Sequence, residues 1–299
     1  MSERKRAIAL GFFDGVHRGH AALLERTKER AAQVGAEPSV LSFDVHPDTL
    51  VFGKEVPLIN SPEDREGIIH REFGIENVVF IHFNKEVMCM DWKDFLDSLI
   101  RELNVCWIVV GYDFCFGYKG QGTTTRLREY CSALGIGCDV IDQVTLDGTV
   151  VSSTYIRDLI QNGDMEKAAR FLGHPHTLSD TIRSGYHLGT KLGTPTINMC
   201  IPAGVLVPRH GVYATQVHLE GKRYTAVTNV GVRPTVSSED RVSVESHILD
   251  LSGNLYGKHA RVDFCHFLRD EIRFASPEEL AAQIRQDVEN AKAYFADSE

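Results

Sequence analysis

A ten-residue segment near the start of the chain combines three glycines with two histidines, residue types that can bind phosphate. The segment is Gly11–His20 (GFFDGVHRGH), and it lies between an apolar run and a helix-like run. Glycines let the backbone approach an anion closely, and a helix start offers free N–H groups and a positive dipole end. His17 and His20 are three residues apart, so both imidazoles could donate hydrogen bonds to one phosphoryl group. We predict a phosphate site here, although the histidine pair alone also fits a turn with two surface histidines.

The elements that must position this segment alternate between strand and helix in the first half of the chain. Buried strands are predicted at 7–13, 39–43, 77–83, 105–110 and 138–141, helices at 19–34, 91–103 and 124–134, and two short helices that start at Ser153 and Asp164 and extend to Leu172. This alternation is typical of a doubly wound α/β domain with a parallel sheet. Ligands of such domains bind at the carboxyl ends of the strands, which is where Gly11–His20 lies.

The second half has a different character. Short β-prone runs at 212–217, 224–229, 242–249 and 260–264 predict a small antiparallel barrel or sandwich. The segment Ser276–Glu279 (SPEE) predicts the start of a closing helix, with a capping serine, a proline at the first helical position and a capping-box glutamate. We place the domain boundary near His174–Leu178, which gives domains 1–173 and 174–299.

Composition indicates a soluble globular protein. The chain has 299 residues, 43% of them hydrophobic, and a net charge of -9, of which -7 falls in residues 1–173. Neither half is therefore a basic nucleic-acid-binding domain. The longest uncharged run, between Lys191 and Arg209, contains three prolines and predicts no membrane helix. The seven cysteines have no metal-ligand spacing and no signal peptide is evident, so we expect free thiols in a cytoplasmic protein.

Segments in both halves resemble one family. Gly11–His20 resembles the nucleotidyltransferase signature Gly-x-Phe-Asp-Gly-x-His-x-Gly-His, specifically that of the prokaryotic bifunctional riboflavin kinase/FMN adenylyltransferases, or FAD synthetases. Further matches in the first half are Phe43–Pro47 (FDVHP), Gly111–Gly117 (GYDFCFG) and Ser152–Arg157 (SSTYIR). In the second half, Leu192–Asn198, His210–Tyr213, Asn229–Thr235, Val244–His247, Leu255–Gly257 and Leu268–Phe274 are similar to riboflavin kinase segments. The resemblance implies a Rossmann-like nucleotidyltransferase domain followed by a β-barrel kinase domain with a C-terminal helix.

For the first domain, the resemblance implies an adenylyltransferase site. ATP binding is assigned to Gly11, Phe13, Asp14, His17, His20, Ser152, Ser153, Thr154 and Arg157, and flavin or phosphate binding to His46 and Asp113. The two serines and Thr154 open a short helix that can hold phosphates, and Arg157 supplies a fixed charge for the leaving pyrophosphate. On the residues alone, Ser153 is equally a helix cap, His46 a buried satisfied histidine and Asp113 a turn aspartate.

For the second domain, the resemblance implies a magnesium-dependent kinase site. Gly193, Thr196 and Asn198 are assigned to ATP and the metal, and Glu245 and Arg269 to the flavin, with Glu245 as the general base. The hydroxyl and amide oxygens are hard ligands that suit Mg2+. On spacing alone, the Pro-Thr-x-Asn segment is more often an Asx-type turn and Glu245 an outward-facing strand residue.

The chain departs from the family pattern at several positions. Val45 replaces a proline, Cys115 and Gly120 replace arginines, Leu188 and Thr190 stand where arginines are usual, and Thr194 replaces a phenylalanine. Each missing arginine that contacts substrate would cost about 1.5–3 kcal/mol of binding. These departures raise the question of whether both activities are retained.

The resemblance implies that the chain makes FAD from riboflavin. The second domain would phosphorylate riboflavin to FMN, and the first would adenylylate FMN and release pyrophosphate, with ATP and Mg2+ in both steps. Three alternatives stay open: an adenylyltransferase alone, a catalytically silent flavin- or nucleotide-binding paralogue, and nucleotidyl transfer to another phosphate monoester.

Overall fold

The computed structural model describes residues 4–183, 196–232, 242–251, 253 and 255–296. The chain forms two compact units, Met1–Ser153 and Thr154–Glu299, which we describe one at a time. The helices α7 (Ser153–Asn162) and α8 (Met165–Leu172) are grouped with the second unit. These helices precede the domain boundary that the sequence places near residue 173, and that boundary stays a prediction.

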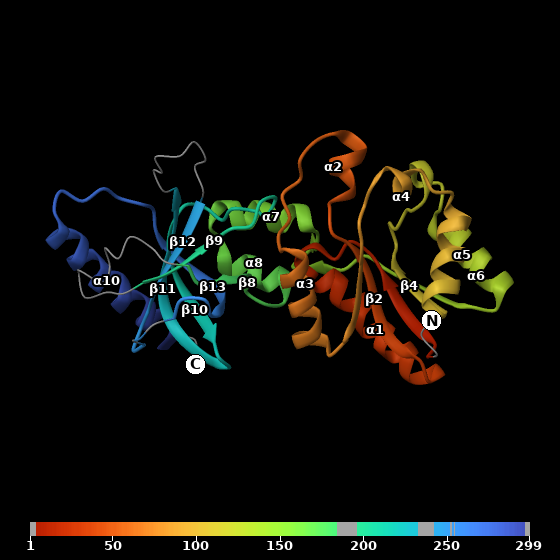
Figure 1. The fold of residues 1–299 in the computed structure, drawn as a ribbon, viewed down its shortest axis with the longest axis horizontal. Coiled ribbons are helices and arrows are strands. Elements are labelled where there is room, and N and C mark those ends of the chain that lie inside the picture. The colour runs from red at the N-terminus through yellow and green to blue at the C-terminus, as the bar shows by residue number, and fades with distance from the viewer. Residues whose placement is uncertain (1–3, 184–195, 233–241, 252, 254, 297–299) are drawn as a thin grey trace. The chain divides into compact units, whose positions relative to one another are not determined.

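The first unit is built on a five-stranded parallel sheet of order β3-β2-β1-β4-β5 (Figure 1). Its strands are β1 (Arg6–Leu10), β2 (Glu37–Phe43), β3 (Asn77–Ile81), β4 (Val105–Gly111) and β5 (Gly137–Ile141), and a small hairpin follows, β6 (Thr145–Leu146) and β7 (Thr149–Val150). Its helices are α1 (Arg18–Val34), α2 (Pro47–Phe52), α3 (Pro62–Ile68), α4 (Lys85–Cys89), α5 (Trp92–Leu103) and α6 (Thr124–Leu134), with short turns η1 (Asp14–Val16), η2 (Ile69–Phe73) and η3 (Tyr118–Gly120). The strand order reverses between β1 and β4, so a crevice is expected at their carboxyl ends.

Two hydrophobic cores, one on each face of this sheet, show that the fold is doubly wound. Ile8 and Leu10 of β1 pack in one core with Phe95 of α5. Ala9, between them, belongs to the other core together with Leu24 of α1. Alternation along a strand sends neighbouring side chains to opposite faces, so both faces of β1 are covered. The predicted α/β fold is confirmed.

Most of the predicted elements of this unit are present, with two differences. The strand predicted at 7–13 ends at Leu10, because Phe13 takes a left-handed backbone conformation (φ 55°) that cannot continue a strand. The short helices α2 and α4 and the hairpin β6–β7 were not predicted, and neither were α3 and η2. Their start is nevertheless marked, since the Oγ of Ser61 accepts from the N–H of Asp64 at 3.0 Å and Pro62 takes the first position.

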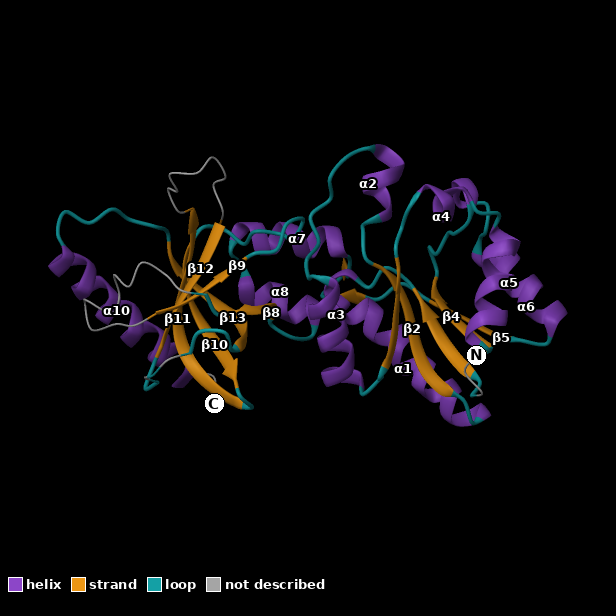
Figure 2. Ribbon diagram, viewed as in Figure 1, coloured by secondary structure: helices purple, strands orange, loops and turns teal. Residues whose placement is uncertain are grey.

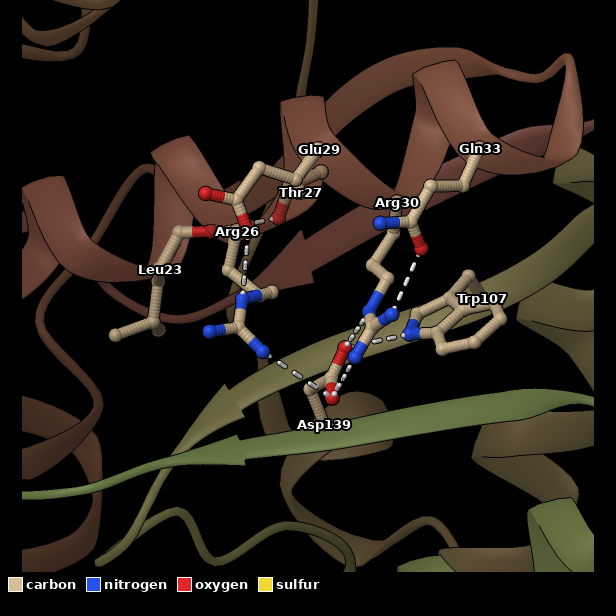
Figure 3. A network of polar contacts seen from close by, with 8 residues as sticks. All are labelled: Leu23, Arg26, Thr27, Glu29, Arg30, Gln33, Trp107 and Asp139. Carbon is tan, nitrogen blue, oxygen red and sulfur yellow. Dashed lines mark hydrogen bonds and ion pairs between the residues drawn. The ribbon is translucent and has the colours of Figure 1, made fainter.

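A carboxylate ties β5 to α1 on one face of the sheet (Figure 3). Asp139 accepts from Nε and Nη2 of Arg30 at 2.6 and 3.0 Å, and from the indole N–H of Trp107 at 2.9 Å. The guanidinium of Arg30 also lies 4.7 Å from the centre of the Trp107 ring. The arginine side chain lowers the pKa of Asp139, despite the opposing effect of burial. This network fixes the amino-terminal helix against the sheet without reaching the carboxyl ends of the strands.

The second unit is a six-stranded antiparallel sheet of order β8-β13-β10-β11-β12-β9 (Figure 2). The strands are β8 (His176–Thr181), β9 (Thr196–Cys200), β10 (Gly211–Leu219), β11 (Lys222–Val232), β12 (Val242–Ile248) and β13 (His259–Arg269). A bridge between Arg183 and Asn198 joins the two edges, so the sheet curls round as a small barrel. The predicted antiparallel barrel is confirmed, although the sequence analysis did not identify β8 and β9 as strands.

The closing helix α10 (Pro277–Ala296) starts as predicted. The Oγ of Ser276 accepts from the N–H of Glu279 at 3.2 Å, and the Glu279 carboxylate reaches back to the N–H of Ala275 at 3.0 Å. The helix packs on the sheet through Ala291, which lies against Val212 and Val227. Within the described ranges, no helix combines the length and the apolarity that crossing a membrane requires.

A histidine buried in β8 should make the second unit sensitive to acid. His176 is 1% exposed, and burial lowers the pKa of its ring to about 4. The unfolded chain takes up this proton near pH 6.5, so between pH 6.5 and 4 the unfolded state binds more protons. Stability is therefore lost as pH falls through this window. We expect His176 to lower the free energy of unfolding of the second unit by about 2 kcal/mol between pH 7 and pH 5.

Urea titrations of wild type and His176→Leu at pH 7 and pH 5 test this expectation. Both tryptophans, Trp92 and Trp107, lie in the first unit, so tryptophan fluorescence follows the unfolding of that unit only. Circular dichroism follows both units. An unfolding transition that changes the circular dichroism but not the fluorescence therefore belongs to the second unit. The variant should lose about 2 kcal/mol less than wild type between the two pH values. Equal losses in the two proteins would contradict the prediction.

Candidate active sites

A cleft of about 510 Å³ opens at the carboxyl ends of β1, β2, β4 and β5. The predicted site residues that line it are Gly11, His17, His20, His46, Asp113, Ser152 and Ser153. Other lining residues come from the same strand ends and the hairpin region, including Phe12, Phe43, Tyr112, Cys115, Gln143 and Val151. The cleft therefore occupies the crevice that the strand order predicts, and residues from all four sequence motifs of the first unit line it.

The two histidines of the first motif are stacked at the start of α1. Their ring centres are 3.6 Å apart with an interplanar angle of 11°, and Nδ1 of His17 accepts from the backbone N–H of His20 at 3.3 Å. This hydrogen bond requires an unprotonated Nδ1, so Nε2 carries the proton of the neutral His17 ring. A Cβ at Gly19 would lie 3.0 Å from Cε1 of His17, so glycine makes room for the stacked ring.

His20 is suited to donate a hydrogen bond without carrying a permanent charge. Burial lowers the pKa of His20 well below its usual value, and the nearby His17 and Arg65 lower it further. His20 is therefore neutral near pH 7 in the free protein. Neutral imidazoles at a helix start can donate to an anion and can gain a proton as negative charge arrives.

His46 repeats this arrangement at the next strand end. Its Nδ1 accepts from the N–H of Asp48 at 3.2 Å and caps α2, which leaves the proton of the neutral ring on Nε2. The ring of Phe12 meets it edge-on at 4.7 Å between centres. His46 is thus both a helix cap and a cleft residue, and Asp113 is an exposed residue of the same cleft.

Other residues of the motifs hold the loop of the Gly11–His20 segment in place through buried contacts. Phe13 and Asp14 are buried, and the Asp14 carboxylate accepts from the backbone N–H groups of Ile59 and Asn60 at 2.9 and 3.4 Å. The hydroxyl of Ser153 donates to the backbone carbonyl of Asp14 at 2.9 Å. These contacts fix the loop, whereas the ATP-binding roles assigned to Phe13 and Asp14 stay predictions. So do those of Thr154 and Arg157, which follow Ser153 along α7.

The second unit has a separate cavity of about 290 Å³ between the barrel and α10. Its polar lining residues are Thr196, Asn229, Glu245, His247, Arg269, Glu271 and Asp287, and its apolar ones are Val212, Val227, Ile272, Phe274, Leu280 and Ile284. An apolar wall with a few polar groups at one end is the usual character of a small-molecule site.

The strand register brings the predicted kinase residues together. Glu245 of β12 lies directly opposite Asn198 of β9 on one side and Asn229 of β11 on the other. Two residues along, His247 lies opposite Thr196. Directly opposite residues share a face of the sheet, so the carboxylate, the amides and the hydroxyl form one polar surface. Glu245 and Thr196 line the cavity, while Asn198 is buried beside them.

A partly buried ion pair that the sequence does not predict lines the cavity. Arg269 donates to the Asp287 carboxylate of α10 through Nε at 3.0 and 3.1 Å and through Nη2 at 2.7 Å. Both residues line the cavity, and the Asp287 side chain is 2% exposed. The charge of Arg269 is therefore largely committed to holding α10, and its flavin-binding role stays a prediction.

Glu271 lines the same cavity and contacts strand β11. Its Oε1 accepts from the side-chain amide of Asn229 at 3.1 Å. A Cβ at Gly231 would come within 2.2 Å of this oxygen, so a side chain at position 231 would displace the carboxylate from its present place. Asn229 thus connects Glu271 with the strand position opposite Glu245.

Two family models match these two units. The FAD synthetase model matches residues 1–155, and the riboflavin kinase model matches residues 172–295. The chain is 32% identical over 293 residues to a bifunctional riboflavin kinase/FMN adenylyltransferase of Listeria monocytogenes, covering 97% of this chain and 93% of the relative. The relative of that name from Pseudomonas fluorescens is 35% identical, with 99% and 95% covered. The chain belongs to the bifunctional riboflavin kinase/FMN adenylyltransferase family.

A solved structure shares the fold of this family member over nearly its whole length. It is a crystal structure described as a macrolide-efflux protein from Streptococcus pneumoniae, with a TM-score of 0.85 and 26% identity. The match covers 98% of this chain and 95% of the solved structure's chain. The order of the two units is therefore the same in both proteins.

Some departures from the family pattern fall inside the adenylyltransferase cleft and others beyond the described residues. Cys115 lines the cleft, at a position where the family pattern has an arginine. The departures at Leu188, Thr190 and Thr194 lie outside the described residues, as does Gly193, which was predicted to bind ATP. Lining residues that were not predicted include Asn229, His247, Glu271 and Asp287 in the kinase cavity and Gln143 in the adenylyltransferase cleft. The family motifs quoted above contain His247 and Glu271, but motif order alone does not distinguish a lining residue from a neighbour.

The donor chemistry of the kinase residues fits a magnesium ion that arrives with ATP. Thr196 and Asn198 offer neutral oxygens, which suit an ion held mainly by phosphates and water. Among the described residues, no cluster of three His, Cys, Asp or Glu side chains could hold a metal by itself. Thr196 and Asn198 would hold the ion, whose chemistry would be to neutralise phosphate charge during transfer.

Proposed function

We propose that this chain makes FAD from riboflavin in two ATP-dependent steps at two separate sites. The single observation that carries the proposal is that each unit matched by a family model has its own cavity, lined by the residues which that chemistry needs. The residues that line each cavity come from one unit, the first unit for the cleft and the second for the kinase cavity.

In the kinase cavity, Glu245 acts as the general base. It takes the proton of the ribityl 5'-hydroxyl as that oxygen bonds to the γ-phosphorus of ATP, and the bond from this phosphorus to the β-γ bridging oxygen breaks to release ADP. The apolar lining residues of the cavity pack against the isoalloxazine ring, and Arg269 and Glu271 are among its polar lining residues. Thr196 and Asn198 orient the phosphates with Mg2+.

In the adenylyltransferase cleft, positioning and charge neutralisation perform the reaction. A phosphate oxygen of FMN attacks the α-phosphorus of ATP, and the bond from this phosphorus to the α-β bridging oxygen breaks to release pyrophosphate. His17 and His20 donate hydrogen bonds to the reacting phosphates at the start of α1, while Ser152, Ser153, Thr154 and Arg157 hold the leaving group. His46 and Asp113 face the flavin phosphate and a polar ligand group.

The proposal extends to location. All seven cysteines are free thiols, which is the usual state in a reducing compartment. We place the protein in the cytoplasm, where riboflavin and ATP meet.

A direct assay tests the function. Purified protein is incubated with Mg2+ and ATP, and with riboflavin or FMN in parallel, and the flavins are separated by chromatography. We expect FMN and FAD from riboflavin, and FAD from FMN. Formation of FAD from FMN alone would support the adenylyltransferase-only alternative, which the arginine departures motivate. Flavin binding without either product would support the silent paralogue and overturn the proposal.

A further inference from the structure

A fully buried arginine outside both cavities holds the two strand ends that form the wall of the adenylyltransferase cleft. Arg65 of α3 is 0% exposed. Its Nη1 donates to the carbonyl of Phe12 at 2.6 Å and to the hydroxyl of Ser42 at 3.0 Å. Its Nη2 donates to the carbonyl of Phe43 at 2.9 Å. One guanidinium thus joins the backbone just after β1 to the carboxyl end of β2.

The contacts of Arg65 extend to a side chain that faces the ligand. Its guanidinium lies 4.7 Å from the centre of the Phe12 ring and 5.2 Å from that of Phe80. The Phe12 ring in turn meets His46 edge-on, and both line the cleft. Arg65 does not line the cleft itself, so it acts through Phe12 and the backbone.

The loop that Arg65 holds is conformationally strained. Phe13 and Val16 have φ values of 55° and 42°, a region that non-glycine residues rarely adopt and that is especially unfavourable for a β-branched side chain. Such conformations persist where the surroundings over-determine them, and they cluster at functional sites. Here the segment from Ile59 to Arg65 hydrogen-bonds to the loop at two points. The N–H of Ile59 donates to the Asp14 carboxylate, and Arg65 donates to the Phe12 carbonyl.

A buried cation is costly to keep, which indicates that this one is retained for its contacts. Burial lowers the pKa of Arg65 to about 10, and nearby Asp14 and Asp44 oppose this effect. The side chain therefore stays charged at neutral pH, when its three hydrogen bonds are charge-assisted. A lysine could supply the charge but not the planar fork that reaches both strand ends.

We propose that Arg65 is a positioning residue for adenylyl transfer, holding the Gly11–Val16 loop in the strained conformation that presents His17 and His20 to the reacting phosphates. This inference rests on the adenylyltransferase function proposed for the cleft. Charge develops on the phosphates in the transition state, so the histidines matter most at that point. Displacing the loop that positions them should therefore lower kcat more than it raises KM.

Steady-state kinetics of the full-length variants Arg65→Met and Arg65→Lys test the inference. For FAD formation from FMN, we expect Arg65→Met to lower kcat by about 10- to 100-fold with KM values for ATP and FMN within about threefold of wild type. Arg65→Lys should recover part of the loss. Riboflavin phosphorylation in the same preparations should be unchanged, since the kinase cavity lies in the other unit.

Arg30→Met is the matched control. Arg30 is also an arginine of the first unit that binds through two nitrogens and stacks on an aromatic ring, but it lies away from the cleft. We expect it to lower thermal stability without lowering kcat. An equal fall in kcat for Arg30→Met and Arg65→Met would overturn the inference, as would an unchanged kcat in Arg65→Met.

If Arg65→Met does not fold, the variant Ser42→Ala tests the inference in its place. Ser42→Ala removes the hydroxyl that donates to the Phe12 carbonyl at 2.7 Å and accepts from Arg65. It should lower kcat by about three- to tenfold, and unchanged kcat in both Ser42→Ala and Arg65→Lys would overturn the inference. Wild-type protein that makes no FAD from FMN would overturn the proposed function instead, so the two failures are distinguishable.

Discussion

Replacing Glu245 with glutamine is expected to lower FMN formation from riboflavin by about 100- to 10,000-fold, the usual contribution of a general base. Glutamine keeps the shape of the side chain and its place opposite Asn198 and Asn229, but it cannot accept the proton of the attacking hydroxyl. The barrel should therefore fold normally and still bind flavin. Chromatography of the flavin products, with riboflavin as the substrate, measures the loss.

The second half of the same experiment distinguishes two sites from one. FMN supplied directly to Glu245→Gln should be adenylylated at the wild-type rate, because Glu245 lines a cavity in the second unit only. The control is Glu220→Gln, which removes an exposed carboxylate paired with Lys258 at 2.9 Å and should leave both steps intact. Equal loss of both steps in Glu245→Gln would argue against separate sites.

The local signals that the sequence carries account for much of the fold. Gly35, Gly135 and Gly173 end helices in the left-handed conformation, Asp91 caps the start of α5, and Ser276 caps α10 as predicted. Such signals act within a few residues, so they can be read directly. β9 was missed because it is short and begins just after Pro195, where its strand identity depends on pairing with β12.

The candidate sites were predictable only as far as a motif contains its own residues. His17, His20, His46 and Glu245 were identified because each lies in a segment with a recognisable pattern, and the structure brings them to cavities. Arg65 and Asp287 could not be found in this way. Each acts on a segment far away in the sequence, Arg65 on Phe12 and Asp287 on Arg269, and a long-range ion or hydrogen-bond partner leaves no local pattern.

The acidic balance of the first unit gives these buried contacts added importance. With a net charge of -7 in residues 1–173, overall charge does not attract ATP to the cleft, so binding depends on local donors. Cys115 removes one cation that the family pattern supplies at the cleft. Donors that remain, above all the histidine pair at the start of α1, must then be held accurately, which is the role that the Arg65 contacts support.

Replacing His17 with asparagine is expected to lower FAD formation from FMN by about 100- to 1,000-fold, the usual cost of removing one donor from a charge-stabilising site. Asparagine is a good helix cap, so its side chain can still accept from the N–H of His20 and start α1. It is too short to place an N–H where the imidazole Nε2 lies. The substitution therefore separates the capping role of His17 from its role as a donor.

The control for this prediction removes an imidazole elsewhere in the same unit. His70, which lies 3.7 Å from Glu66 and outside the cleft, should tolerate replacement by asparagine with both activities unchanged. In His17→Asn, riboflavin phosphorylation should stay at the wild-type rate, because the kinase residues are in the second unit. If His17→Asn kept full adenylyltransferase activity while retaining α1, the histidine would be a helix cap and the phosphates would have to depend on His20 and the backbone N–H groups alone.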